Sequence, residues 1–204
     1  MAGCAEEGID MGGTTTGPAA GPSEMGAASC VGLCAAGEGG AESQLERDGL
    51  YGPVGWTEKA GLAALLDPEG KGPGWGGITR FEHLTGGDVA ALRAALPPEQ
   101  LDDRQNEAPS LGALLAAGEA HPGGVMLSGY WVRTPRLDER VSVDGLLVRA
   151  TACGAAPESV RLGRREVWEW LHRVLDLGEC GEPDELSRWL FADDGMLGWW
   201  LWWD

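Results

Sequence analysis

Four of the ten tryptophans stand among the last six residues, and this segment is the strongest candidate for recognition chemistry. In an extended strand, Trp199, Leu201 and Trp203 lie on one face, and Trp200 and Trp202 lie on the other. Indole rings anchor protein interfaces and also dominate the packing of cores. We expect the first face to pack on helices. For the second face we favour packing too. The alternative is an open platform in which Trp200 and Trp202 bind a partner.

A polar run at positions 102–109, DDRQNEAP, is the second candidate. Arg104, Gln105 and Asn106 bring many hydrogen-bond donors to the end of a predicted helix, which suits binding of a carboxylate or an amide. We favour a structural role, in which they cap that helix and fix the loop to Ser110, because polar side chains at helix ends usually satisfy backbone groups. Under the alternative, all three are binding residues.

Two further patterns predict ordinary structure. Arg161, Arg164 and Arg165 precede a predicted helix, where the helix dipole disfavours positive charge, so we expect a solvated or salt-bridged patch. The run 72–77, GPGWGG, spells G-x-G-x-x-G. A dinucleotide site needs a strand before this motif and a helix after it. The sequence predicts neither, so we interpret the run as a loop.

No catalytic or metal-binding set emerges from the remaining residues. Cys30 and Cys34 lack a second pair of ligands, and the three histidines are too scattered to share one helix face, so we predict no metal site. The signatures Gly-x-Ser-x-Gly, Ser-x-x-Lys and the P-loop do not occur. Cys153 or Cys180 beside His172 stays open as a nucleophile and base, because spacing does not decide it. We therefore assign no catalytic residue and no cofactor.

The charge balance narrows the classes of partner. Among 204 residues there are 32 acidic and 15 basic ones, a formal net charge of −17. Such a surface repels nucleic-acid phosphates and anionic lipids, so we predict neither partner. It serves solubility, which we favour from charge alone, or it suits a basic protein. No apolar run approaches the ~20 residues of a membrane helix, and the first residues lack a secretory pattern, so we expect a cytoplasmic protein.

Residues 1–48 differ in composition from the rest. The first 41 residues include 11 glycines and 9 alanines, and no aromatic residue precedes Tyr51. Such a segment buries too little apolar area to offset the entropy of ordering, so we predict a disordered tail. The alternative is that translation starts at Met11 or Met25. Residues 49–204 are predicted to form a single domain.

Periodicity and turn signals predict the elements of this domain. Helices are predicted over 57–66, 89–96, 99–105, 111–121, 164–177 and 183–191. Thr57 is predicted as the N-cap of the first of these helices, and Ser110 as the N-cap of the fourth. Strands are predicted over 125–133 and 198–204, and 78–84 is compatible with a strand or a turn. Asp144-Gly145 between apolar runs predicts a hairpin; the alternative is one longer strand with a bulge at Gly145. The predicted fold class is α+β, an antiparallel three-stranded meander (124–151) plus a C-terminal strand, packed with four to six short helices.

Several stretches resemble uncharacterised proteins of high-GC bacteria. They are DDRQNEAPS (102–110), HPGG (121–124), GYWVRTPRLDERVSVDG (129–145) and the terminal WWLWWD. The resemblance covers about half of the predicted domain and implies no activity, so it transfers no functional residue.

Charge, tryptophan content and the missing catalytic set together lead to a functional hypothesis. We expect a non-catalytic protein that binds a protein partner, as an immunity or antitoxin protein does. A basic partner is one option that the charge allows. The alternative is a small hydrolase or sugar-acting enzyme with a Trp-lined cleft and a carboxylate pair. The oligomeric state stays open.

Overall fold

The structure, a computed structural model, describes residues 48–154 and 162–204. The predicted tail lies outside these residues apart from Asp48, and Arg161 lies outside them as well. The described residues form an α+β domain around one antiparallel sheet, as predicted, with five strands rather than four. The strands are β1 (Ile78–Leu84), β2 (Val125–Val132), β3 (Arg140–Arg149), β4 (Glu185–Leu190) and β5 (Leu197–Trp202), in the order β1-β2-β3-β5-β4.

Five α-helices occur in the described residues, within the predicted range of four to six. They are α1 (Trp56–Lys59), α2 (Leu62–Leu66), α3 (Gly87–Ala95), α4 (Leu111–Ala120) and α5 (Arg164–Val174). Ser110 caps α4 as predicted, since its side chain accepts a hydrogen bond from the Ala113 amide. The predicted helix 57–66 is split at Gly61, whose φ of 74° interrupts helical geometry, and Thr57 lies inside α1 rather than capping it. The predicted helix 99–105 is instead a 3₁₀ turn at Pro98–Asp102.

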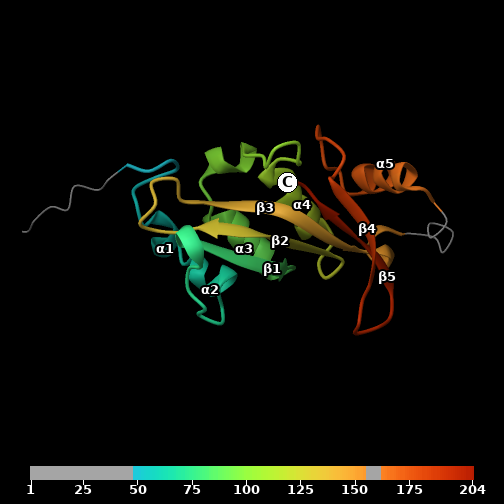
Figure 1. Ribbon diagram of the computed structural model, residues 1–204, viewed down its shortest axis with the longest axis horizontal. Coiled ribbons are helices and arrows are strands. Elements are labelled where there is room, and N and C mark those ends of the chain that lie inside the picture. The colour runs from blue at the N-terminus through green and yellow to red at the C-terminus, as the bar shows by residue number, and fades with distance from the viewer. Residues whose placement is uncertain (1–47, 155–161) are drawn as a thin grey trace, which may run out of the picture. The chain divides into compact units, whose positions relative to one another are not determined.

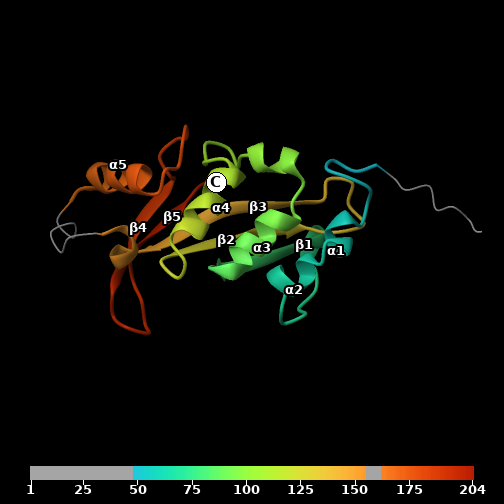
Figure 2. The same ribbon diagram turned by 180° about the vertical axis from the view of Figure 1, so that it is seen from behind.

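The helices cover one face of the sheet. Figure 2 shows α3 and α4 in front of the strands, and Figure 1 looks onto the opposite face, over which no helix of the described part lies. Gly118 lets α4 pack closely against α3 and β2, because a Cβ at this position would stand 3.1 Å from Val89 of α3 and 3.4 Å from Leu127 of β2. The covered face of the central strands is built from Val125, Leu127, Trp131, Val141, Val143, Leu146 and Val148, all buried.

The C-terminal strand predicted from tryptophan content is confirmed as β5, and it lies inside the sheet. It pairs with β3 on one side and β4 on the other. Trp199, Leu201 and Trp203 are 2%, 0% and 1% exposed, so the first of the two predicted faces packs inward. Helix α5 supplies the opposing rings: Trp170 meets Trp199 with centroids 5.2 Å apart, and Trp168 meets Trp203 at 6.1 Å.

The predicted hairpin at Asp144-Gly145 is wrong, and the alternative of one long strand is correct. Strand β3 runs through both residues, and the register shifts where Ser128 pairs with Gly145 but Gly129 pairs with Val143. Asp144 is the extra residue of this bulge. The hairpin fails because the eight-residue β2 is long enough to pair with both apolar runs in succession.

The predicted helix 183–191 is also wrong, because these residues form β4. Leu186, Trp189 and Leu190 stand at i, i+3 and i+4, which fits a helix over so short a window. In the structure Leu186 pairs opposite Leu201, whereas Trp189 is 43% and Leu190 69% exposed. The side of β5 that does not face β3 needs a hydrogen-bonding partner, because β5 is largely buried and its backbone groups would otherwise stay unpaired. Pairing of residues 185–190 with this side of β5 outweighs their helical spacing.

A buried carboxylate fastens the β2–β3 loop to α1. Glu139 is 1% exposed. Its Oε1 accepts a hydrogen bond from Gly55 N at 2.7 Å, and its Oε2 accepts from Thr57 N at 3.3 Å and Thr57 Oγ1 at 3.0 Å. The carboxylate thus satisfies amides at the beginning of a helix that has no side-chain cap of its own.

Replacing Glu139 with alanine is expected to lower the free energy of unfolding by about 2–4 kcal/mol, because buried donors lose their acceptor and a cavity opens. Urea unfolding followed by tryptophan fluorescence measures the loss. Glu99→Ala is the matched control, since Glu99 is exposed, and a change within about 0.5 kcal/mol is expected there. Equal small losses in both variants would contradict the structural role of Glu139.

Candidate functional site

The uncovered face of the sheet carries a row of aromatic side chains. Strand alternation places Trp200 and Trp202 of β5, Trp189 of β4 and Tyr130 of β2 on this side, opposite to the buried residues of the same strands. We call these four residues the aromatic face. Trp189 is 43% exposed, and the other three are half-buried. The aromatic face is therefore accessible to a partner.

A glycine in β3 holds Trp200 against the sheet. A Cβ at Gly145 would lie 2.4 Å from Cη2 of Trp200, so only glycine leaves room for the ring there. Trp202 pairs opposite the same glycine. The Trp200 ring thus rests on the sheet, and both indoles are half-buried. The sequence leaves two interpretations of Trp200 and Trp202, packing in the core or an open platform. The structure lies between them, because both side chains are half-buried.

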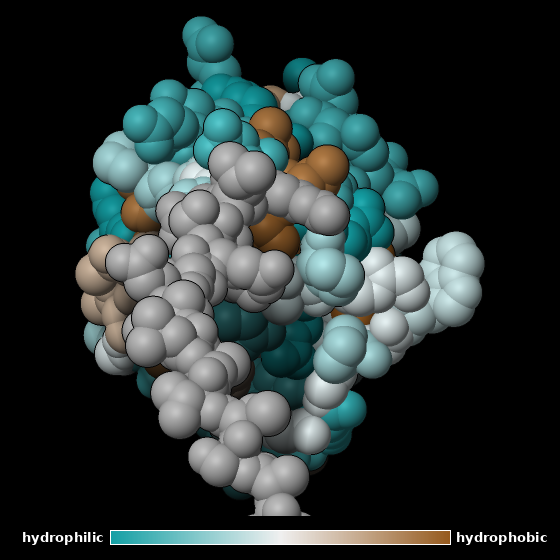
Figure 3. Space-filling model, turned by 90° about the vertical axis from the view of Figure 1, so that its left-hand side faces the viewer, coloured by the Kyte–Doolittle hydropathy of each residue, from teal (hydrophilic) through white to brown (hydrophobic). Residues whose placement is uncertain are grey.

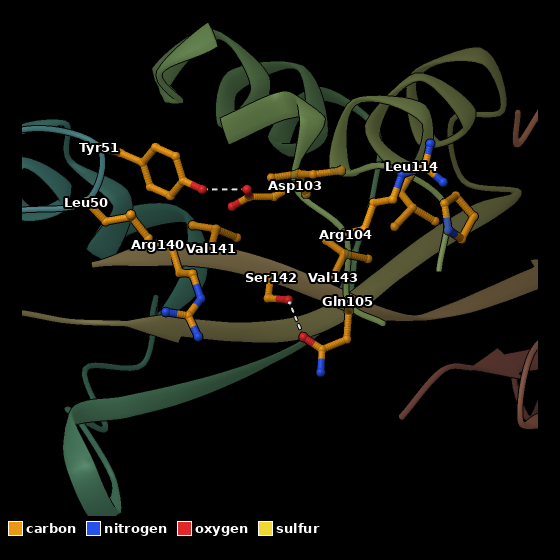
Figure 4. Close-up of a pocket in the computed structure, with 12 residues that line it drawn as sticks. Leu50, Tyr51, Asp103, Arg104, Gln105, Leu114, Arg140, Val141, Ser142 and Val143 are labelled. Carbon is orange, nitrogen blue, oxygen red and sulfur yellow. Dashed lines mark hydrogen bonds between the residues drawn. The ribbon is translucent and has the colours of Figure 1, made fainter. Parts of the chain in front are cut away.

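A pocket of about 240 Å³ opens at the margin of this face (Figure 4). It lies where residues 140–143 of β3 extend past the end of β5, so the segment 103–105 rather than a strand borders β3 there. Its polar lining comes from Tyr51, Asp103, Arg104, Gln105, Arg140 and Ser142, and its apolar lining from Leu50, Pro109, Leu111, Leu114, Val141 and Val143. Arg104 and Gln105 of the sequence-predicted binding residues line it. Asn106, Trp200 and Trp202 do not.

The three polar residues of the DDRQN run have partners far away in the sequence rather than capping the preceding turn. Arg104 donates a hydrogen bond to the carbonyl of Glu179, and Asn106 donates to that of Asp204. Gln105 Oε1 accepts from Tyr130 Oη at 2.7 Å and from Ser142 Oγ at 3.3 Å. Gln105 therefore joins the pocket to the aromatic face. Its Nε2 has no partner in the described part of the chain and is a free donor.

A phenol–carboxylate pair forms the other end of the pocket. Tyr51 donates a hydrogen bond to Asp103, as Figure 4 shows. Burial, together with the hydrogen bond and the charge of Asp103, raises the pKa of Tyr51 to about 12. The phenol therefore stays protonated near neutral pH and acts as a donor.

This pair predicts a loss of stability at high pH. The pKa of Tyr51 rises from 10.0 in the unfolded chain to about 12 in the folded one, so the folded state holds the extra proton between these values. The contribution of this proton to the free energy of unfolding is fully present below pH 10 and is lost as the pH rises toward 12. We expect the wild type to lose on the order of 1 kcal/mol more than Tyr51→Phe across this window in urea unfolding. Parallel losses in the two proteins would contradict the pairing.

The end of the domain where α1 and the β2–β3 loop lie is hydrophilic over most of its described residues (Figure 3). Its cations are internally paired. Arg133 contacts Glu58 at 2.8 Å and Asp67 at 3.3 Å, and Asp138 is 2.8 Å from both Arg136 and Arg140. The hydrogen bond from Arg136 holds the pKa of Asp138 well below its usual range. Charge at this end is compensated within the domain.

The margin of the aromatic face beside Trp202 is predominantly acidic. Glu185 pairs opposite Trp202, the amide of Asp204 donates to Asp184 Oδ2 at 2.9 Å, and Gly181 beside them donates to the carbonyl of Glu107. We call Glu107, Asp184, Glu185 and Asp204 the acidic margin. Among the described residues, no cation forms an ion pair with any of these carboxylates, although Arg164 donates a hydrogen bond to the backbone carbonyl of Asp184. Acidic side chains still outnumber this cation, so the margin keeps a net negative charge.

The remaining sequence candidates are dispersed or structurally engaged. The 72–77 run is a loop that ends in a 3₁₀ turn (Trp75–Gly77) and leads into β1; as predicted, no strand of the described part leads into it. Arg164 donates to the carbonyl of Asp184, and Arg165 pairs with Glu169 at 2.9 Å. Within 48–154 and 162–204, no three His, Cys, Asp or Glu side chains gather as metal ligands. Burial raises the pKa of the Cys180 thiol, which disfavours a thiolate there. Cys30 and Cys34 lie outside the described residues.

Sequence reasoning missed part of the site. The sequence predicts a helix at Trp189, and this prediction does not place Trp189 on the sheet. The sequence-based predictions also do not include Tyr51, Tyr130 or Ser142 among the candidate site residues. For Tyr130, the alternation of strand 125–133 already placed it away from Trp131. Tyr51 and Ser142 reach the pocket only through long-range folding, and no local signal marks them.

Comparison with known protein families, with curated proteins and with solved structures found no match. Among the helices of the described part, none has both the length and the apolarity needed to cross a bilayer. The function is therefore inferred from the geometry and charge of the aromatic face, the pocket and the acidic margin.

Proposed function

We propose that this chain is a protein-binding domain, and that its aromatic face contacts a partner of net positive charge. One observation carries the proposal: three tryptophans and a tyrosine lie accessible on the sheet face that no helix of the described part covers. Tryptophan and tyrosine are the residues most enriched among energetic hot spots of protein interfaces.

The packing of the indoles supports a binding role. Trp200 rests on Gly145, and Tyr130 is held by its hydrogen bond to Gln105, so these rings are ordered before a partner arrives. Rings that are already ordered lose little conformational entropy on binding, which leaves more of the contact energy for affinity. The free Nε2 of Gln105 at the pocket mouth adds a directional donor for a carbonyl or a carboxamide of the partner.

The charge distribution favours a basic partner. The acidic margin lies beside Trp202, and the whole chain carries a formal charge of −17. Such a field accelerates the encounter with a cationic protein and opposes nucleic acid or anionic lipid. Inhibition of a basic effector, as by an immunity or antitoxin protein, fits this chemistry. The alternative of a Trp-lined hydrolytic cleft gains no support, since no tryptophan lines the pocket of about 240 Å³ or a larger groove along β1.

Selection of binders from a displayed peptide library on the full chain tests the proposal. We expect the recovered peptides to be enriched in lysine and arginine. Titration calorimetry is expected to show that Trp202→Ala weakens their binding about tenfold or more. Trp75→Ala is the matched control, because Trp75 is 96% exposed but lies away from the aromatic face, and it should leave affinity unchanged. Neutral or acidic binders, or binders indifferent to Trp202→Ala, would contradict the proposal.

A further inference from the structure

A second and larger groove, of about 800 Å³, runs along the outer edge of β1. We propose that it takes an extended, lysine- or arginine-bearing segment of the partner, which adds to β1 as a further strand. The inference rests on the proposed function for the basic character of the partner only. The binding surface is a different one, at the opposite edge of the sheet from β4.

The walls of the groove leave one side of β1 open along its length. All seven residues of β1 line it, and the chain between Leu65 and Gly74, which follows from α2, forms the facing wall. Asp88, at the beginning of α3, closes one end. Figure 1 shows β1 at the edge of the sheet with α2 beside it. A segment in the groove would therefore lie against a strand edge.

Backbone alternation shows which groups face the groove. Gly77 O accepts from Arg133 N on the β2 side, whereas Ile78 O accepts from Gly74 N on the outer side. Successive residues of a strand point their amide and carbonyl groups to alternate sides. The backbone groups of Arg80 and Glu82 thus point outward, and neither residue has a backbone partner there in the described part of the chain. An exposed strand edge of this kind is a template for strand addition.

The length of the free edge is set by two local features. At one end, the bond between Gly74 and Ile78 occupies the first outward carbonyl. At the other end, His83 has a φ of 60° and the register shifts between Phe81 and Leu84, so a bulge terminates the straight edge. The available edge is short, and it matches a partner segment of a few residues rather than a long strand.

The groove carries a net negative charge, because acidic residues outnumber basic ones in its lining. Its cations are engaged: Lys71 pairs with Glu69 at 2.7 Å, and Arg80 pairs with Asp144 at 2.6 Å. Glu82 and Asp88 are exposed, and no cation of the described residues forms an ion pair with either, although Lys71 lies near enough to Glu82 for the two charges to attract each other. The groove therefore favours a segment with basic side chains at positions that face these carboxylates.

Two other occupants are disfavoured by charge. The chain's own residues 1–47 include seven acids and one base, so they are repelled by Glu82 and Asp88. A second copy of the chain brings a formal charge of −17 to the same place. Both remain distinguishable outcomes of the experiment.

The probe is a seven-residue peptide that alternates lysine with threonine, acetylated and amidated at its ends, added to the full ¹⁵N-labelled chain. We expect amide signals of Arg80 and Glu82 to shift and to gain protection from hydrogen exchange. Two further peptides carry backbone N-methyl groups on alternate residues, in opposite phases. Strand addition uses the amides of one phase only, so we expect one peptide to bind and the other to lose binding. Equal behaviour of the two would overturn the proposal.

Substitutions in the protein separate this site from the aromatic face. The double variant Glu82→Gln, Asp88→Asn is expected to weaken peptide binding about five- to tenfold, from the loss of two exposed charge contacts. Glu99→Gln, a matched removal of an exposed carboxylate, should leave it unchanged. Sensitivity to Trp202→Ala alone would place the peptide on the aromatic face and overturn the inference.

Protection of the Arg80 and Glu82 amides from hydrogen exchange before any peptide is added would also overturn the inference, because the strand edge would already be occupied. Dependence of that protection on protein concentration would then identify a second copy as the occupant, and independence the chain's own tail.

Discussion

Deletion of residues 198–204 is expected to abolish cooperative unfolding of the domain. The deletion removes the strand that joins β3 to β4, together with the buried side chains of Trp199, Leu201 and Trp203. Loss of one buried tryptophan costs about 3–5 kcal/mol and loss of a buried leucine about 2–5 kcal/mol. Their sum reaches the whole stability of a typical domain, about 5–15 kcal/mol.

Thermal unfolding followed by circular dichroism measures this effect. The single variant Trp203→Ala should retain a transition at a clearly lower temperature, and Trp75→Ala, which removes a 96% exposed indole, should leave it unchanged. A truncated chain that melts at the temperature of the intact one would show that β5 is not an interior strand. The sheet order would then be incorrect.

Substitution of Gly129 by alanine is the second large effect that we expect, a loss of about 3 kcal/mol or more. A Cβ at this position would stand 2.0 Å from the carbonyl oxygen of Ser142 and 2.9 Å from Cζ of Phe81. The close contact is with backbone, so side-chain rotation does not relieve it. The strands would have to separate beside the bulge at Asp144.

Urea unfolding of Gly129→Ala beside Gly87→Ala checks this prediction. Gly87 begins α3 with open space around its Cβ position, and a helical glycine changed to alanine is neutral or slightly stabilising. Similar stabilities for the two variants would mean that β2 and β3 do not approach each other at Gly129 as described.

Elements with a long or strongly marked pattern were predictable from the sequence. Helix α4 has the Ser110 cap and a run of leucines, and α5 repeats Val167 and Leu171 at helical spacing; both form as predicted. Strands β2 and β5 were identified by alternation and by aromatic content. In these segments local propensity and tertiary packing agree.

In short segments the secondary structure depends on pairing with strands that are distant in the sequence, and no local pattern predicts this pairing. The window from Leu186 to Leu190 fits either a helix or a strand, and only the free side of β5 selects the strand. Asp144-Gly145 fits either a turn or a bulge, and the length of β2 selects the bulge. Both errors arise where the partner strand is distant in sequence.

The same distinction between local patterns and long-range folding applies to the candidate site. The two faces of β5 followed from alternation, so the separation of Trp200 and Trp202 from the buried tryptophans was predictable. The pocket was not predictable, because its lining residues Tyr51 and Asp103 are 52 residues apart and Gln105 and Ser142 are 37 apart. The net charge by itself favoured solubility and left a basic partner as the alternative. The acidic margin appears only when three distant segments converge.

The ten indole N–H signals of the full ¹⁵N-labelled chain test the central claim most directly, when a basic peptide selected as above is added. Assignment by Trp→Phe variants makes each tryptophan its own reporter. We predict that the signals of Trp189, Trp200 and Trp202 shift on binding, while the buried Trp131, Trp199 and Trp203 and the exposed Trp75 keep theirs. A peptide that binds and shifts Trp75, or leaves all three tryptophans of the aromatic face unmoved, would contradict the claim that this face is the contact surface.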